Sequence, residues 1–157
     1  MMPLVAGTTI AAPIFSRKFG LGKNDELKRI LKLTTNTIFI ITFPILLIIF
    51  IFSDPLMALY GKDFVESGKV LRVLLIGLFF NALTGPISVM LQMSEKQVLV
   101  QNVFLATTVI NILLSFFLIP KFGIMGAAWS NVIYQFLANG ILLIYLKRKF
   151  GYLSFGR

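Results

Sequence analysis

The sequence has no cysteine and no histidine, and few of its residues are charged. Without cysteine the chain can form no disulfide and no thiolate nucleophile, and without histidine it has no imidazole metal ligand. Charged residues make up 13% of the chain, against roughly 25% in soluble domains. Hydrophobic residues reach 57% and the mean hydropathy is +0.90, more apolar surface than a soluble fold of 157 residues could bury. These shortages predict a membrane protein.

The residue groupings typical of enzymes are absent from the sequence as well. It has no nucleophile beside a base, no paired carboxylates with a plausible partner, and no glycine-rich phosphate loop followed by Lys-Ser/Thr. The acidic residues lie between the apolar runs, whereas an ionisable residue within a span would indicate function by default. We therefore expect a protein that is not an enzyme, with no catalytic residue, no metal and no cofactor.

Four long stretches contain no Asp, Glu, Lys or Arg, and each has 21 to 25 residues. About 20 helical residues cross the hydrocarbon core of a bilayer. A fifth run, 1–16, is shorter and lacks the basic start and cleavage site of a signal peptide, so we interpret it as the rear part of a helix whose front is missing. The sequence thus predicts an all-α, polytopic transmembrane helix bundle. It has one partial span, 1–16, and four full spans, 33–53, 73–94, 97–120 and 122–146.

The net charge of +9 is distributed unevenly between the loops. Eleven of the 15 basic residues lie in an amphipathic linker (17–32), at Lys96 or in the tail (147–157). The remaining four lie in or near an interfacial loop (54–69) or at Lys121. The positive-inside rule places the eleven, and with them the C-terminus, in the cytoplasm. The charge therefore indicates topology, with no nucleic-acid partner.

Three of these cations, Lys28, Arg29 and Lys32, face one side of the linker while apolar residues face the other. They are candidates for contact with anionic lipid headgroups. The alternative is that they only fix the orientation of the chain in the membrane.

Proline positions predict local structure between and within the spans. Pro44 should kink its span. Asp54 can cap a short interfacial helix whose first position is Pro55. The pair Pro120-Lys121 separates two apolar runs, and we expect a tight outer turn there between antiparallel spans.

Small residues recur at helical spacing in two of the spans, and we expect them to pack against neighbouring helices. In lipid, helices gain little by hiding large apolar side chains, so the small residues that allow close backbone approach mark the packed face. The candidates are Gly77, Gly85, Gly123, Gly126 and Ala127.

Uncharged amides are numerous for four spans: Asn81, Gln92, Gln101, Asn102, Asn111, Asn131, Gln135 and Asn139. One interpretation is hydrogen bonding between helices, worth about 0.6 kcal/mol each. The other is that some line a hydrated cavity for a polar cargo. Gln101, Thr108, Asn111 and Ser115 share an arc of about 80° on one helix, which makes them the better cavity candidates.

Several segments resemble one known family of transporters. The most specific is INILLSFFLIPKFGIMGAAWSNVIYQ (110–135), followed by DPLMALYGKDFVESGKVLRVLLIGLFFNALTGPISVMLQMSEKQ (54–97) and LKRILKLTTNTIF (27–39). They are similar to the C-terminal half of polysaccharide biosynthesis transporters, the O-antigen and related flippases of the multidrug/oligosaccharidyl-lipid/polysaccharide exporter superfamily. The resemblance covers nearly the whole chain and includes loops as well as spans.

The resemblance implies a C-terminal lobe of a two-lobed transporter around a central cavity. The implied function is movement of undecaprenyl-diphosphate-linked oligosaccharide across the inner membrane, in O-antigen, capsule or exopolysaccharide biosynthesis. The implied partners are membrane lipid, this lipid-linked substrate and the missing N-terminal lobe, supplied by the same reading frame or by a second polypeptide. By analogy the first run lines the cavity, which adds Thr8 and Thr9 as candidates.

Two alternatives remain open at this point. One is a small membrane subunit or scaffold that transports nothing itself. The other is part of a drug/cation antiporter of the same superfamily, although such antiporters usually need carboxylates within the membrane, and the spans contain none.

Overall fold

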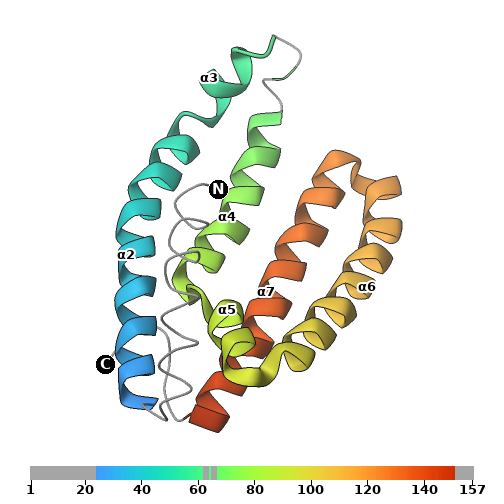
Figure 1. The fold of residues 1–157 in the computed structure, drawn as a ribbon. Coiled ribbons are helices and arrows are strands. Elements are labelled where there is room, and N and C mark those ends of the chain that lie inside the picture. Colours follow the sequence, from blue (N-terminus) through green and yellow to red (C-terminus); the bar gives the residue numbers. More distant parts are fainter. Residues whose placement is uncertain (1–23, 62–63, 65–66, 151–157) are drawn as a thin grey trace.

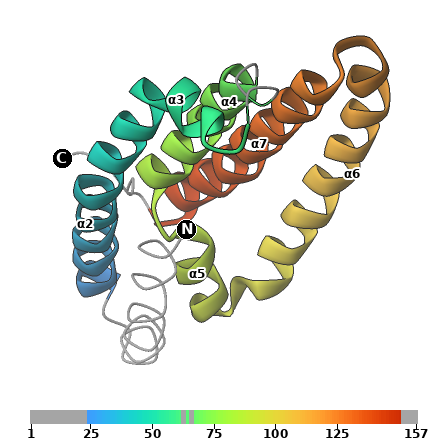
Figure 2. The same ribbon diagram turned by 90° about the horizontal axis from the view of Figure 1, so that it is seen from above.

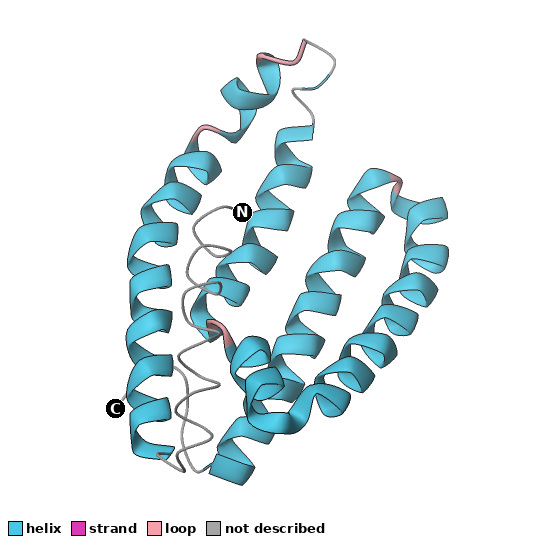
Figure 3. Ribbon diagram, viewed as in Figure 1, coloured by secondary structure: helices cyan, strands magenta, loops and turns pink. Residues whose placement is uncertain are grey.

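The computed structural model describes residues 24–61, 64 and 67–150, and every element it contains is helical (Figure 3). α2 (Asn24–Ile51) leads through α3 (Ser53–Ala58) to α4 (Ser67–Thr84). α5 (Ile87–Leu91) and a five-residue π-helical segment, η2 (Gln92–Lys96), then connect α4 to α6 (Gln97–Phe122). α7 (Ile124–Phe150) completes the described chain. The partial span expected at 1–16 lies outside the described residues.

The long helices stand in a row in the order α2, α4, α7, α6, with α6 leaning away at one edge (Figures 1 and 2). Their directions alternate along the chain, so α2 and α6 begin at the end of the bundle where α4 and α7 stop, and the neighbours α4 and α7 run parallel (Figure 1). Four segments are long and apolar enough to cross a membrane: Lys28–Ile51, Ser67–Thr84, Ile87–Phe122 and Ile124–Lys149. Many large side chains on α2 and α6 are exposed, as lipid-facing side chains are in a bundle without its bilayer.

The apolar core lies at the end of the bundle where α2 and α6 begin. Leu31, Ile87, Met90, Leu91, Val100, Leu142 and Leu146 form one buried cluster there, drawn from α2, α5, α6 and α7. Aromatic rings join the helices farther along. Phe39 and Phe43 of α2 contact Phe79 of α4, and Phe80 of α4 stacks on Phe136 of α7 with ring centroids 4.0 Å apart.

The span expected at 73–94 differs most from the structure. α4 begins earlier, at Ser67, and ends at Thr84, and the chain breaks at Gly85-Pro86 before α5. The 18 residues of α4 rise about 27 Å, just short of a hydrocarbon core of about 30 Å. α5 and η2 then complete the crossing and reverse the chain, where Glu95 adopts a positive φ of 60°.

Two other expectations about helix ends need correction. The outer turn is at Gly123 (φ 58°), because α6 continues through Pro120 to Phe122. Proline is tolerated there because the Gly123 N–H still closes the last turn on the Ile119 carbonyl at 2.8 Å. Gly123 is exposed, and a Cβ there would meet nothing within 4 Å, so it serves the turn rather than helix packing.

The cap of the short interfacial helix also differs from expectation. α3 begins at Ser53, its N-cap residue is Phe52, and no side chain caps it, so Asp54 is not the cap. Asp54 instead pairs with Arg72 of α4 at 2.5 Å. α2 is continuous from Asn24 into the span, and Pro44 lies within it.

Candidate functional site

The break between α4 and α5 lies inside the uncharged run 73–94, which was expected to form one spanning helix. Gly85 has φ +68°, and its N–H bonds to the Asn81 carbonyl at 3.1 Å. Pro86 has no N–H to donate, and Ile87 closes a short turn on the Gly85 carbonyl at 2.9 Å. Irregular backbone within a membrane is tolerated only where protein buries it or where it lines a hydrated cavity. Residues 84 to 87 are all buried, and a cavity lies beside them.

This cavity, the inner pocket, has a volume of about 200 Å³ and lies where α4, α5, α6 and α7 meet. Five of its lining side chains are polar and none is charged. The full lining is Asn81, Gly85, Pro86, Ser88, Phe104, Tyr134, Gln135, Ala138 and Asn139.

Hydrogen bonds within α7 order one wall of the inner pocket. Gln135 Nε2 donates to Asn131 Oδ1 at 2.8 Å, and Asn139 Nδ2 donates to the Gln135 carbonyl at 3.0 Å. Gln135 Oε1 is buried and has no hydrogen-bond partner in the described part of the chain. A buried acceptor left without a partner costs roughly 1–3 kcal/mol.

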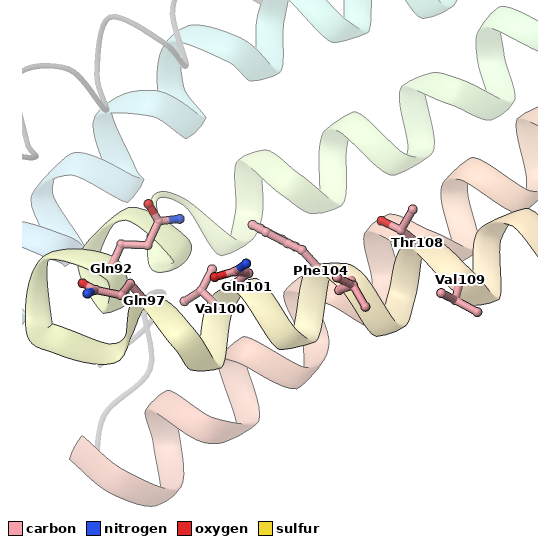
Figure 4. A pocket seen from close by; sticks show the side chains of 8 residues that line it. Gln92, Gln97, Val100, Gln101, Phe104, Thr108 and Val109 are labelled. Carbon is pink, nitrogen blue, oxygen red and sulfur yellow. The ribbon is translucent and has the colours of Figure 1, made fainter.

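A second space, the open groove, runs along α6 with a volume of about 590 Å³. Figure 4 shows Gln92 and Gln101 at one end and Thr108 farther along, with Phe104 between Gln101 and Thr108. Its lining residues are Gln92, Gln97, Val100, Gln101, Phe104, Leu105, Thr108 and Val109. Phe104 lines both spaces, so its side chain lies between the groove and the inner pocket.

The polar side chains of α6 that were expected to line one cavity lie at two different places in the structure. Gln101 and Thr108 line the open groove. Asn111 and Ser115 line neither the groove nor the inner pocket. Ser115 Oγ lies 3.3 Å from Asn111 Oδ1 and 2.7 Å from Ser130 Oγ of α7, so this pair belongs to the α6–α7 contact. Thr8 and Thr9 lie outside the described residues.

The other residues expected in helix packing lie close to neighbouring elements. A Cβ on Gly77 would come within 2.8 Å of Gln135 Nε2, so Gly77 leaves the space that this amide occupies. A Cβ on Gly126 would overlap the Leu118 carbonyl across the α6–α7 turn and lie 3.0 Å from the Ile119 nitrogen. Ala127 is half-buried beside it, and its carbonyl accepts a hydrogen bond from Ser130 at 2.9 Å.

The candidate lipid-contacting cations lie at the start of α2. Lys28 and Arg29 are exposed and Lys32 is half-buried. The basic residues at the end of α7, 147–149, lie at the same end of the bundle (Figure 1). Contact of these cations with anionic headgroups stays a prediction.

Sequence reasoning did not locate the inner pocket, although it singled out its amides. Asn81, Gln135 and Asn139 belong to the set expected either to bond between helices or to line a cavity. The dipeptide Gly85-Pro86 is the sequence signal for the break that opens the space. Among residues 24–61, 64 and 67–150 there is no group of His, Cys, Asp and Glu that could hold a metal ion. The chemistry available in both spaces is hydrogen bonding to uncharged groups.

Comparison with known proteins gives two matches. The family model described as MatE matches residues 1–117. A protein of Shigella flexneri named "Putative O-antigen transporter" is 30% identical over 125 residues, which is 77% of this chain and 30% of that protein. The chain thus spans about 30% of the length of this relative. No solved structure matches. Both matches point to a multi-pass membrane transporter and not to an enzyme.

Proposed function

The chain belongs to the MatE family, and on that premise we propose that it forms part of a flippase for lipid-linked oligosaccharide. The cargo is undecaprenyl-diphosphate-linked oligosaccharide, moved across the inner membrane in O-antigen, capsule or exopolysaccharide biosynthesis. The name of the Shigella flexneri relative, an O-antigen transporter, supports this class of cargo.

The observation that carries the proposal is the open groove on α6. Gln92, Gln97, Gln101 and Thr108 add uncharged polar groups to a lining that is otherwise apolar. Polar side chains in hydrocarbon are unfavourable unless they have partners. Hydroxyl-rich sugars can both donate and accept hydrogen bonds, so they suit amide and hydroxyl linings.

A second lobe is part of the proposal. Gln101 and Thr108 are exposed, and α6 packs chiefly on α7 within the described chain. An N-terminal lobe, from the same reading frame or a second polypeptide, would cover the groove and close a central cavity. We assign the diphosphate to cations of that lobe, because none of the described residues that line the groove or the inner pocket is charged.

Complementation of a flippase-deficient cell tests this function. The chain is expressed alone and together with an N-terminal lobe, and restored surface polysaccharide is measured. We expect rescue only by the combination. The double change Gln101→Leu and Thr108→Val should abolish rescue, whereas Ile112→Leu on the exposed face of α6 should not.

Three outcomes would contradict parts of this proposal. Rescue by the chain alone as a monomer would overturn the requirement for a second lobe. Absence of rescue in every combination, with both lobes present in the membrane, would overturn the flippase function. Full rescue by the Gln101/Thr108 double variant would remove the groove from the transport path.

A further inference from the structure

We propose that the inner pocket is a subsite for one uncharged sugar ring, reached from the open groove past Phe104. The inference deepens the proposed function and rests on it for the class of ligand. It is carried by the polar side chains that line the pocket, by its size and by its aromatic walls.

The lining excludes charged groups and favours hydroxyls. Among the residues that the structure describes, no acidic or basic side chain lines the pocket, so a phosphate or a carboxylate would have no counter-charge from them there. Asn81 and Asn139 can each donate and accept, and the Ser88 and Tyr134 hydroxyls can do both. In the described part of the chain, the side chains of Asn81, Ser88 and Tyr134 make no hydrogen bond to protein. Hydroxyl groups of a sugar would satisfy them.

Gln135 is held firmly in the wall of the pocket. Its Nε2 donates to Asn131 Oδ1 at 2.8 Å, and Gly77 of α4 lies close against the amide. The amide is therefore a fixed part of the wall.

Size and shape limit the ligand to a single ring. A volume of about 200 Å³ equals roughly six to seven water molecules at ~30 Å³ each. That space suits one sugar ring with its hydroxyls but not a chain of them. Phe104 and Tyr134 add aromatic surfaces to the lining, against which the apolar C–H face of a sugar ring can pack.

Phe104 is the boundary through which the ring would pass. It lines both the groove and the inner pocket, and its side chain is only half-buried. A rotation of this side chain would join the two spaces without moving a helix. Sugar held in the groove would then have a polar path to the break at Gly85-Pro86.

The absence of cysteine in the chain makes the pocket directly testable. Ser88→Cys and, separately, Ala138→Cys place a single thiol in the lining of the full chain in lipid nanodiscs. The rate of reaction with methyl methanethiosulfonate is measured with and without glucose or N-acetylglucosamine. At a sugar concentration equal to its dissociation constant, the rate should fall about twofold. Ser115→Cys, at the α6–α7 contact, should not be protected.

Variants of the lining separate binding from folding. Tyr134→Phe and Asn139→Leu, each added to Ser88→Cys, should weaken protection by sugar while the reaction rate without sugar and the melting temperature change little. Phe104→Ala should speed the reaction of Ser88→Cys in the absence of sugar. An unchanged rate in Phe104→Ala would remove its role as the boundary.

The remaining outcomes decide the subsite itself. No protection of either cysteine by either sugar would overturn it, as would protection by sodium chloride but not by sugar. If neither cysteine reacts at all, the pocket is closed to a reagent smaller than a sugar ring, and the subsite is again overturned.

The subsite and the proposed function can fail separately. Protection by sugar without rescue of a flippase-deficient cell would contradict the proposed function and leave the subsite standing. Rescue of the cell without protection by sugar would contradict the subsite and leave the proposed function standing.

Discussion

Gly85 at the α4–α5 break lies directly against Thr35 of α2. A Cβ on Gly85 would overlap the Thr35 hydroxyl oxygen and lie 2.8 Å from both Cβ and Cγ2 of that residue. Gly85 also has φ +68°, which L side chains rarely adopt. Glycine is therefore required at this position for two reasons, the backbone conformation and the close approach of Thr35. The contact ties the break in one spanning helix to the buried face of another.

Gly85→Ala should destabilise the protein markedly. A left-handed backbone costs about 1–2 kcal/mol with a side chain, and overpacking adds about 1–3 kcal/mol. Thermal unfolding in detergent measures the change. Thr35→Ala removes the nearest atoms, so it should recover part of the loss in the Gly85→Ala background and couple non-additively with it. Equal melting temperatures for Gly85→Ala and the unsubstituted chain would contradict the close contact.

Gly126→Ala should weaken the α6–α7 hairpin, because the added Cβ would overlap the Leu118 carbonyl, which cannot move aside as a flexible side chain could. Gly140 lies on the same helix with nothing within 4 Å of a Cβ, and it serves as the matched control. Gly140→Ala should be neutral or stabilise the chain by up to about 1 kcal/mol. The melting temperature should therefore fall for Gly126→Ala and stay the same or rise for Gly140→Ala. A shift of the same sign and size in both would show that Gly126 is not tightly packed.

Arg72→Gln should loosen α3 from α4. Arg72 Nε donates to the buried Ser53 hydroxyl at 2.6 Å, and its Nη2 pairs with Asp54. Because both partners of the ion pair are partly exposed, we expect the free energy of unfolding to fall by up to about 1 kcal/mol. The decrease should be smaller at high salt. Lys69→Gln removes an exposed cation from the same helix and should change little. Equal melting temperatures for the two variants at low salt would show that the Arg72 contacts do not stabilise the protein.

The spanning helices were largely predictable from sequence, because lipid excludes charged residues from long stretches of the chain. The ends of the helices were less predictable. An uncharged run such as 73–94 does not reveal where backbone geometry interrupts it, and the break at Gly85-Pro86 lies within that run. Pro120 looked like a helix end, yet a proline near the last turn removes only one donor, and Gly123 makes the turn.

The site was only partly predictable for a related reason. Helical spacing places Gln101, Thr108, Asn111 and Ser115 on one face, but it does not say which neighbour each meets. Ser115 lies against Ser130 of α7, with Asn111 beside it on α6. Gln101 and Thr108 line the groove instead. The inner pocket joins residues from four helices, so it depends on tertiary packing that no single periodicity contains.

The alternating helix directions and the clustered cations predict the sidedness of the chain. Reporter domains fused after Arg157 and inserted within 62–69 should lie on opposite sides of the membrane, with the C-terminal fusion in the cytoplasm. Replacing Lys147, Arg148 and Lys149 with Gln should weaken this bias. Reporters on the same side would contradict the four-span topology.

Direct measurement of translocation tests the central claim, a role in flipping lipid-linked oligosaccharide. Liposomes carry a fluorescent undecaprenyl-diphosphate oligosaccharide, and the chain is reconstituted together with an N-terminal lobe. Quenching from outside reports the fraction of probe that reaches the outer leaflet. The account predicts that the inner-leaflet probe becomes accessible with both lobes present, and that the Gln101→Leu, Thr108→Val double variant slows this. An accessible fraction equal to that of protein-free liposomes, with both lobes inserted, would contradict it.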